Sequence, residues 1–169
     1  MNLNKLNIEG RIECMADEIM NLGLDNLMIV GIHTGGVWIA ERVNQILQYS
    51  EGIGKLDISF YRDDFSRVGL NPEVKSSEFN IDIEDKNIIL IDDVLYTGRT
   101  IRAAMNEIFS YGRPAKVLLA VLIDRSGREL PIQADIIGCK LDLADDQQVK
   151  LINKKGKLKI KTVTRDNIQ

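Results

Sequence analysis

Two adjacent carboxylates, Asp92 and Asp93, are the residues of this chain whose type and position are best suited to chemistry. They follow the apolar run 88–91, and the hydroxyl-bearing residues Thr97 and Thr100 come shortly after them. Carboxylate oxygens accept hydrogen bonds from sugar hydroxyls, and threonine hydroxyls can donate to phosphate oxygens. One short segment therefore offers a clamp for a ribose and a cradle for a phosphate, at the separation of a sugar 5-phosphate.

The elements predicted around this segment are a strand before it and a helix after it. Four consecutive apolar residues are typical of a strand buried on both faces, and Ile101, Met105 and Ile108 recur at the spacing of one helix face. Ligands of open α/β sheets bind at the carboxyl ends of strands, and a helix N-terminus offers unpaired backbone N–H groups to phosphate. Gly98 would let the backbone approach a ligand closely. The alternative is a buried strand that ends in an ordinary capped turn.

The same order of strand, polar loop and helix recurs along the chain. The loop with Thr34, Gly35 and Gly36 follows an apolar run, and its glycine pair fits either a tight turn or the close approach of a ligand. Strands that alternate with helices indicate an α/β fold. The apolar periodicity predicts helices over residues 7–22 and 37–47, and strands over 27–32, 55–61, 116–123 and 134–138.

Two later segments differ from this pattern. Residues 62–80 are too polar and irregular for a packed element, so they are predicted to form a functional lid or a plain surface loop. Residues 148–163 contain two alternating runs around the turn residues 153–156, which predicts a C-terminal β-hairpin. The lysines of this hairpin are interpreted as the solvated face of an edge strand, where lysine also opposes aggregation.

Composition narrows the class of protein. The chain has 169 residues, of which 44% are hydrophobic, and this suits a single domain over residues 1–169. A net charge of −3 argues mildly against nonspecific nucleic-acid binding, and a single histidine excludes a histidine-rich metal site. No apolar run approaches the ~20 residues that span a bilayer, so a cytoplasmic protein without a membrane segment is expected. Cys14 and Cys139 form no paired motif and are expected to be reduced, buried thiols.

The string 88–100 resembles the phosphoribosyl pyrophosphate (PRPP) motif of type I phosphoribosyltransferases. Its second half, 94–100, is similar to one branch of that family, which combines uracil phosphoribosyltransferase activity with attenuation of pyrimidine operons. The segment 124–131, Asp-Arg-Ser-Gly-Arg-Glu-Leu-Pro, resembles the same branch. The resemblance covers roughly residues 8–163.

The resemblance implies the type I fold, with a central mostly parallel sheet flanked by helices, a small hood and a flexible lid over residues 62–80. It implies that Asp92 and Asp93 act in catalysis by holding ribose hydroxyls or waters of a Mg²⁺ ion that arrives with PRPP, with no direct protein cage for the metal. Arg62, at the hinge end of the lid, is the implied catalytic contact to pyrophosphate. The implied substrate-binding residues are Thr34, Gly35, Gly36, Asp92, Asp93, Val94, Leu95, Tyr96, Thr97, Gly98, Arg99, Thr100, Arg125 and Val149.

Three positions depart from the family pattern. Gly35 stands where many relatives have an arginine, and His33 where they have a lysine, so positive charge near the pyrophosphate is lost or weakened. Tyr96 stands where purine-specific relatives have an aspartate proposed as general base, which favours a pyrimidine. Arg125 is a candidate nucleotide contact, with a salt bridge to a neighbouring aspartate as the alternative.

The implied reaction joins uracil to PRPP and yields UMP and pyrophosphate, with Mg²⁺ as cofactor. The alternatives are a UMP-sensing, RNA-binding attenuator with little catalysis, and a phosphoribosyltransferase for another base. RNA binding requires clustered lysine or arginine, whereas the first predicted helix exposes Glu9, Glu13 and Asp17, so charge does not favour RNA. Family precedent implies a homodimer or a larger homo-oligomer.

Overall fold

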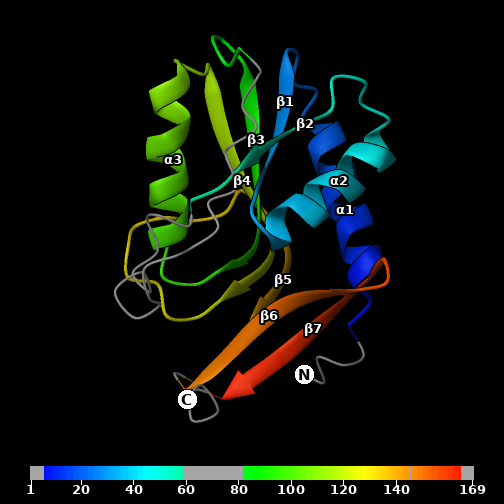
Figure 1. Cartoon of the computed structure of the whole chain (residues 1–169), viewed down its shortest axis with the longest axis vertical. Coiled ribbons are helices and arrows are strands. Elements are labelled where there is room, and N and C mark those ends of the chain that lie inside the picture. The colour runs from blue at the N-terminus through cyan, green and yellow to red at the C-terminus, as the bar shows by residue number, and fades with distance from the viewer. Residues whose placement is uncertain (1–5, 59–81, 145, 165–169) are drawn as a thin grey trace.

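The computed structural model describes residues 6–58, 82–144 and 146–164. In chain order its elements are α1 (Ile8–Asn21), β1 (Leu27–Ile32), α2 (Gly35–Leu47), β2 (Ile53–Leu56), β3 (Asn87–Leu95), α3 (Arg99–Tyr111), β4 (Lys116–Arg125), β5 (Ile136–Leu141), β6 (Gln147–Lys154) and β7 (Lys157–Thr164). The first five strands form one parallel sheet in the order β2-β1-β3-β4-β5, with β3 at its centre. Helix α3 covers one face of this sheet, and α1 and α2 cover the other (Figure 1).

The central strands are apolar on both faces because helices cover both faces. In β3, Ile88 and Leu90 belong to the core cluster on the α3 side, whereas Ile89 and Ile91 belong to the cluster on the α1 and α2 side. Successive side chains of a strand point to opposite faces, so a continuous apolar run is what a two-sided core requires. The predicted α/β class with a parallel sheet is confirmed.

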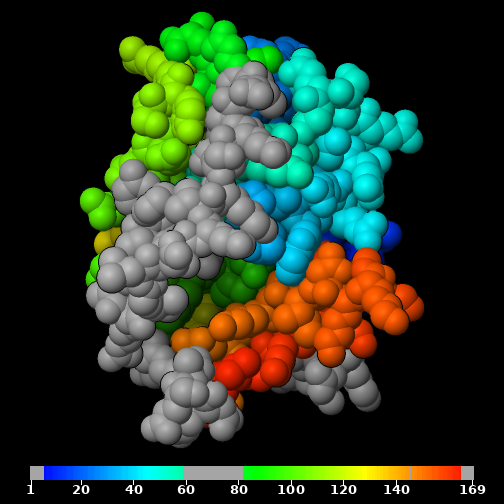
Figure 2. Space-filling model, in the orientation of Figure 1, coloured from blue at the N-terminus to red at the C-terminus, as the bar shows by residue number. Residues whose placement is uncertain are grey.

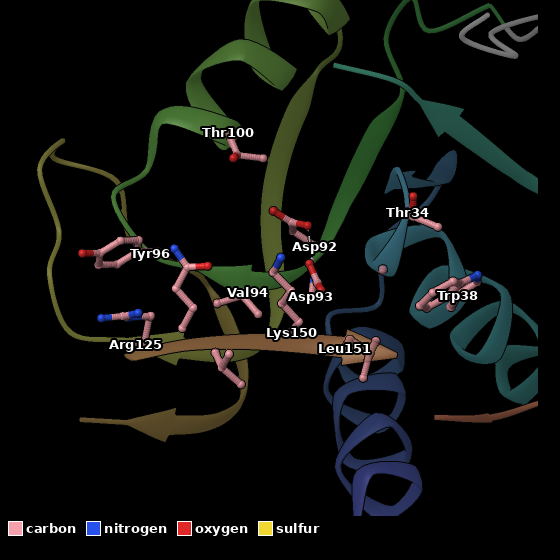
Figure 3. Close-up of a pocket in the computed structure, with 13 residues that line it drawn as sticks. Thr34, Trp38, Asp92, Asp93, Val94, Tyr96, Thr100, Arg125, Lys150 and Leu151 are labelled. Carbon is pink, nitrogen blue, oxygen red and sulfur yellow. Dashed lines mark hydrogen bonds between the residues drawn. The ribbon is translucent and has the colours of Figure 1, made fainter. Parts of the chain in front are cut away.

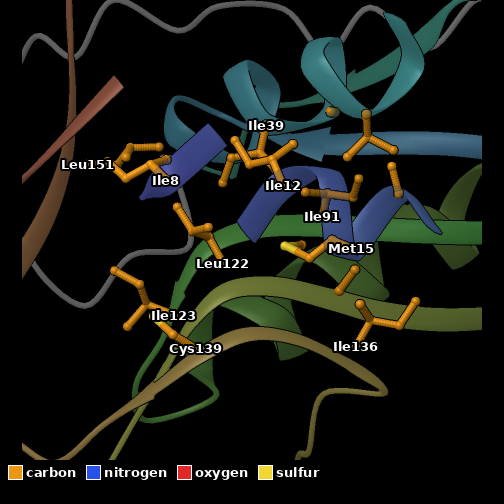
Figure 4. Packing of buried hydrophobic residues seen from close by; sticks show 14 of the residues in the cluster. Ile8, Ile12, Met15, Ile39, Ile91, Leu122, Ile123, Ile136, Cys139 and Leu151 are labelled. Carbon is orange, nitrogen blue, oxygen red and sulfur yellow. The ribbon is translucent and has the colours of Figure 1, made fainter. Parts of the chain in front are cut away.

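The hairpin β6-β7 is a separate antiparallel sheet below the main sheet in Figure 1. Its buried face joins the core cluster that contains α1, as the proximity of Leu151 and Ile8 in Figure 4 shows. The predicted hairpin over 148–163 is therefore confirmed within one residue at each end. The hairpin is a two-stranded sheet of its own, so each of its strands is an edge strand with one unpaired side, as the sequence had suggested.

Several predicted boundaries were wrong. β3 does not stop at the two carboxylates but runs through them to Leu95, because Asp92 and Val94 still pair with β4. β2 ends at Leu56 and does not include Asp57 or Ile58, and β5 starts at Ile136.

The expectation of two buried thiols holds for one cysteine only: Cys139 is buried, but Cys14 is exposed on α1. The predicted lid over 62–80 lies outside the described residues.

Candidate active site

A cavity of about 400 Å³ opens where the carboxyl ends of β3 and β4 face the hairpin. Figure 2 shows the hollow between the green β3 and β4, the blue α2 and the orange hairpin. Its walls come from segments far apart in the chain, which the sheet order brings together (Figure 3). The lining residues are Thr34, Gly35, Trp38, Asp92, Asp93, Val94, Tyr96, Thr100, Arg125, Gln148, Val149, Lys150 and Leu151.

The two carboxylates differ in how much they are held. Asp92 is 3% exposed, and its Oδ1 accepts a hydrogen bond from the backbone N–H of Asp93 at 2.9 Å. Asp93 is only partly buried and presents its carboxylate to the cavity (Figure 3). The pair therefore combines one fixed carboxylate with one that a ligand can reach more freely.

The glycines of the first loop fit α2 tightly against β3. A Cβ at Gly36 would lie 2.3 Å from the carbonyl oxygen of Ile91, and a Cβ at Gly35 would lie 2.4 Å from Oδ2 of Asp93. These contacts explain the glycine pair as a packing requirement of the turn. Gly35 also lines the cavity, so the loop approaches a ligand without side-chain obstruction. Half-buried His33 does not line the cavity.

The loop before α3 is suited to an anion. Gly98 adopts a left-handed conformation with φ of 95°, and α3 begins directly after it, at Arg99. The first backbone N–H groups of a helix lack partners within the helix, so they and the hydroxyl of Thr100 can bind phosphate. Arg99 N donates to Oγ1 of Thr97 at 3.2 Å, which fixes the turn.

A second loop holds the first one in place. Both Glu129 N and Leu130 N donate to the carbonyl oxygen of Thr97 at 3.0 Å, and Arg99 Nε forms an ion pair with Glu129 Oε2 at 2.8 Å. Arg128 donates to the carbonyl oxygen of Tyr96 and forms an ion pair with the carboxylate of Asp124. The segment after β4 thus positions the segment before α3.

Arg125 is the second buried polar residue of the cavity, at 3% exposure. Its guanidinium lies over the ring of Tyr96, 3.8 Å from the ring centroid. Nε donates to the carbonyl oxygen of Ser126 at 3.2 Å and Nη1 to that of Gln147 at 2.7 Å, whereas Nη2 has no hydrogen-bond partner among the described residues. The alternative of a salt bridge to a neighbouring aspartate is wrong, since no described carboxylate pairs with this side chain.

The structure brings together most, but not all, of the residues expected to bind substrates. The side chain of Leu95 is 1% exposed and packs in the core beside α3, so it does not line the cavity. Arg62 lies outside the described residues. Of the remainder, Thr34, Gly35, Asp92, Asp93, Val94, Tyr96, Thr100, Arg125 and Val149 line the cavity, whereas Gly36, Thr97, Gly98 and Arg99 do not.

Sequence reasoning missed four lining residues, which are Trp38, Gln148, Lys150 and Leu151. Trp38 lies near the start of α2 and is half-buried. It falls outside the regular spacing of the apolar residues of this helix, so the sequence pattern did not mark it. Alternation along a strand places Gln148 and Lys150 on one face of the hairpin, whose lysines were interpreted from the sequence as a solvated face. What it could not show is that the hairpin turns this face towards the carboxylates (Figure 3).

The carboxylate pair fits a magnesium ion that a substrate brings with it. Mg²⁺ prefers oxygen ligands and usually keeps several waters, with one or two carboxylates from the protein. Within the described segments, no group of three or more histidine, cysteine, aspartate or glutamate residues could cage a metal. The residues present therefore suit an ion held chiefly by phosphate oxygens and water.

Comparison with known proteins gives a family and close relatives. The family described as phosphoribosyl transferase domain matches residues 3–152. The bifunctional protein PyrR of Nitrosococcus oceani is 60% identical over 125 residues, which are 73% of this chain and 71% of the relative. The protein of the same name from Pseudomonas aeruginosa is 51% identical over 130 residues, which are 77% of this chain and 76% of the relative.

Solved structures share the fold at lower identity. A hypoxanthine-guanine-xanthine phosphoribosyltransferase aligns with a TM-score of 0.62 and 17% identity, covering 84% of this chain and 82% of its own. A purine phosphoribosyltransferase from Pyrococcus horikoshii Ot3 aligns with a TM-score of 0.63 and 22% identity, covering 88% and 93%. No helix in the described part of the chain is long and apolar enough to cross a membrane.

Proposed function

We propose, from the premise that the chain belongs to the phosphoribosyltransferase family and is similar to proteins named PyrR, that it transfers ribose 5-phosphate from PRPP to uracil. The products are UMP and pyrophosphate. The single observation that carries this proposal is the shared cavity. It holds a carboxylate pair for the ribose, the start of α3 for the 5-phosphate, and a buried guanidinium with a spare N–H for the base.

The reaction needs positioning and charge stabilisation more than a nucleophile. The bond from C1 of the ribose to pyrophosphate weakens first, so the sugar acquires the character of an oxocarbenium ion. Asp92, fixed by the backbone N–H of Asp93, accepts from a ribose hydroxyl, and Asp93 faces the developing positive charge. Bound Mg²⁺ would supply positive charge to the departing pyrophosphate. The 5-phosphate is held at the start of α3.

The base subsite lies between Val94 and the hairpin, with Tyr96 and Arg125 at its side. Nη2 of Arg125 can donate to a carbonyl oxygen of the base, which would satisfy the one guanidinium nitrogen that has no partner among the described residues. Position 96 carries a phenol rather than a carboxylate base. The N1–H of uracil is acidic enough to need less help than a purine nitrogen, so a tyrosine here supports a pyrimidine.

The test is the initial rate with labelled uracil, PRPP and Mg²⁺, with hypoxanthine, guanine and orotate as competitors. We expect uracil to be the only one of these bases that is converted to a nucleotide. The double variant Asp92→Asn, Asp93→Asn should lose at least about a hundredfold in kcat/KM, because two ribose contacts lose their charge. Absence of turnover with every base would refute the enzyme, and turnover with a purine would refute the assignment of the base.

A second function, UMP-dependent attenuation through RNA, is favoured by the lysines around the hairpin turn. Lys154, Lys155 and Lys157 are exposed, and none forms an ion pair within the described part of the chain. Helix α1, by contrast, exposes Glu9 and Glu13. Retention of the leader transcript of the chain's own operon on the protein, with and without UMP, tests this function separately from catalysis.

A further inference from the structure

Lys150 is the one lysine among the described lining residues of the cavity. It lies on β6 between Val149 and Leu151, whose side chains are buried on the core side of the hairpin. Because side chains alternate along a strand, Lys150 projects from the opposite face. Figure 3 shows its side chain rising from β6 towards Asp92 and Asp93.

Among the described residues that line the cavity, Arg125 is the only other one with a positive charge. A side chain at position 35 would collide with the carboxylate of Asp93, so the first loop brings no cation to this place. Arg125 donates to two backbone carbonyls and stacks on the ring of Tyr96, and its remaining nitrogen, Nη2, is assigned to the base. Lys150, in contrast, makes no ion pair with a described carboxylate, so its ammonium is available to a ligand.

The hairpin also places a like charge beside this lysine. Lys150 lies directly opposite Lys161 of β7, and both side chains are exposed. Like charges at directly opposed positions destabilise a pair of strands. An anion bound to Lys150 would relieve this repulsion, and the Lys150 ammonium would offset the negative charge of the two carboxylates that face the same ligand.

We propose that Lys150 binds the pyrophosphate group of PRPP, so that the hairpin β6-β7 supplies the cation that the loop with Gly35 and Gly36 does not. This inference rests on the proposed function, since it assigns a further contact to the same substrate. An ammonium is a compact charge that suits phosphate oxygens without demanding a fixed planar geometry. Lys150 thereby stabilises the leaving group from the side of the cavity opposite to the Thr34–Gly35 loop.

The test is calorimetric binding of PRPP, inorganic pyrophosphate and UMP, each with Mg²⁺, to the wild-type protein and three variants. In Lys150→Met, we expect affinity for PRPP and pyrophosphate to fall about 10- to 100-fold, which is the usual cost of one charged hydrogen bond. Affinity for UMP, which has no pyrophosphate, should change less than about threefold. Lys150→Arg should recover most of the binding, and Lys161→Met, the matched cross-strand control, should lose less than about fivefold, because only the relieved repulsion disappears.

Each other result overturns the inference in a different way. Unchanged affinity of Lys150→Met for PRPP and pyrophosphate would remove Lys150 from the site while leaving the proposed transferase intact. An equal loss for UMP would move the contact to the ribose 5-phosphate or the base. If Lys161→Met lowered affinity as much as Lys150→Met, the loss would reflect the overall positive charge of the hairpin and not a contact made by Lys150. If the wild type bound none of the three compounds, the proposed function would fail together with the inference.

Discussion

At the scale of single residues, the cavity is built from charged groups whose freedom differs. Asp92 and Arg125 are both 3% exposed and are fixed by hydrogen bonds to backbone atoms. Asp93 and Lys150 reach the cavity from less buried positions. Buried polar groups keep a fixed geometry only when their bonds are satisfied. Nη2 of Arg125 is a buried donor without a partner among the described residues, so a bound ligand would complete its hydrogen bonding.

Replacing Arg125 with lysine should impair use of the base rather than use of PRPP. A lysine keeps the charge but has no planar fork, so it cannot serve Ser126, Gln147 and a base together. We expect kcat/KM for uracil to fall about tenfold or more, with KM for PRPP within about threefold. Steady-state kinetics measure both values. Unchanged uracil kinetics in Arg125→Lys would contradict the assignment.

Tyr49, which lies outside the cavity, makes the free energy of unfolding depend on pH in a predictable direction. The hydroxyl of Tyr49 donates to the carbonyl oxygen of Leu27, and burial, followed by the nearby Glu51 carboxylate, raises the pKa of Tyr49 above its ordinary value of 10.0. A raised pKa means that the folded state holds the proton more tightly than the unfolded state. The contribution to stability is therefore complete below pH 10 and is lost as the pH rises through the raised value.

Tyr49→Phe should accordingly lower the free energy of unfolding by about 0.5–1.5 kcal/mol at neutral pH, the usual net value of one hydrogen bond. The difference between the two proteins should shrink at alkaline pH, where the wild type loses the same bond. Urea unfolding over a pH series measures this convergence. A constant difference at all pH values would show that the hydroxyl proton is not the source of the effect.

At the scale of elements, the site depends on how closely α2 meets β3. The two loop glycines stand against different parts of β3. Gly36 faces a backbone carbonyl of Ile91, which cannot move without disturbing the sheet, whereas Gly35 faces the side chain of Asp93. One glycine therefore protects the fold, and the other protects the position of a functional carboxylate.

This difference predicts that one alanine variant mainly loses stability and the other mainly loses activity. Gly36→Ala should lower the free energy of unfolding by about 1–3 kcal/mol, as overpacking usually does. Gly35→Ala should cost less stability, because the Asp93 side chain can turn away, but it should lower kcat at least about tenfold by displacing that carboxylate. Chemical unfolding and initial rates separate the two effects. Equal losses of stability in both variants would contradict the distinction.

The elements were largely predictable, and the relations between distant elements were not. Apolar periodicity located β1, β4 and α1 because local patterns determine them. The end of β3 was placed too early because Asp92 and Asp93 are polar, yet Asp92 and Val94 still pair with β4. The stacking of Arg125 on Tyr96 and the approach of Lys150 to the carboxylates depend on tertiary contacts, which no local pattern contains.

At the scale of the whole molecule, the cavity lies between the main sheet and the hairpin, which differ in how many elements pack against them. The main sheet has five strands with helices on both faces, and β3 is bonded on both sides along most of its length. The hairpin has two strands and one buried face. An isolated pair of strands is marginal unless it packs on something else, so the hairpin depends on its contact with the cluster around α1.

Hydrogen exchange should therefore show two levels of protection. We expect the amides of Ile89, Leu90 and Ile91 in β3 to exchange slowest, and those of β6 and β7 to exchange at least about a hundredfold faster through local opening. PRPP with Mg²⁺ should slow exchange in β6 more than in β3, because a ligand held by both the main sheet and the hairpin opposes opening of the hairpin. Leu158→Ala, which removes apolar contact from the buried face of β7, should speed hairpin exchange and leave β3 unchanged. Hairpin amides as slow as those of β3 would mean that the molecule opens as one unit, and the hairpin would then be a fixed wall of the site.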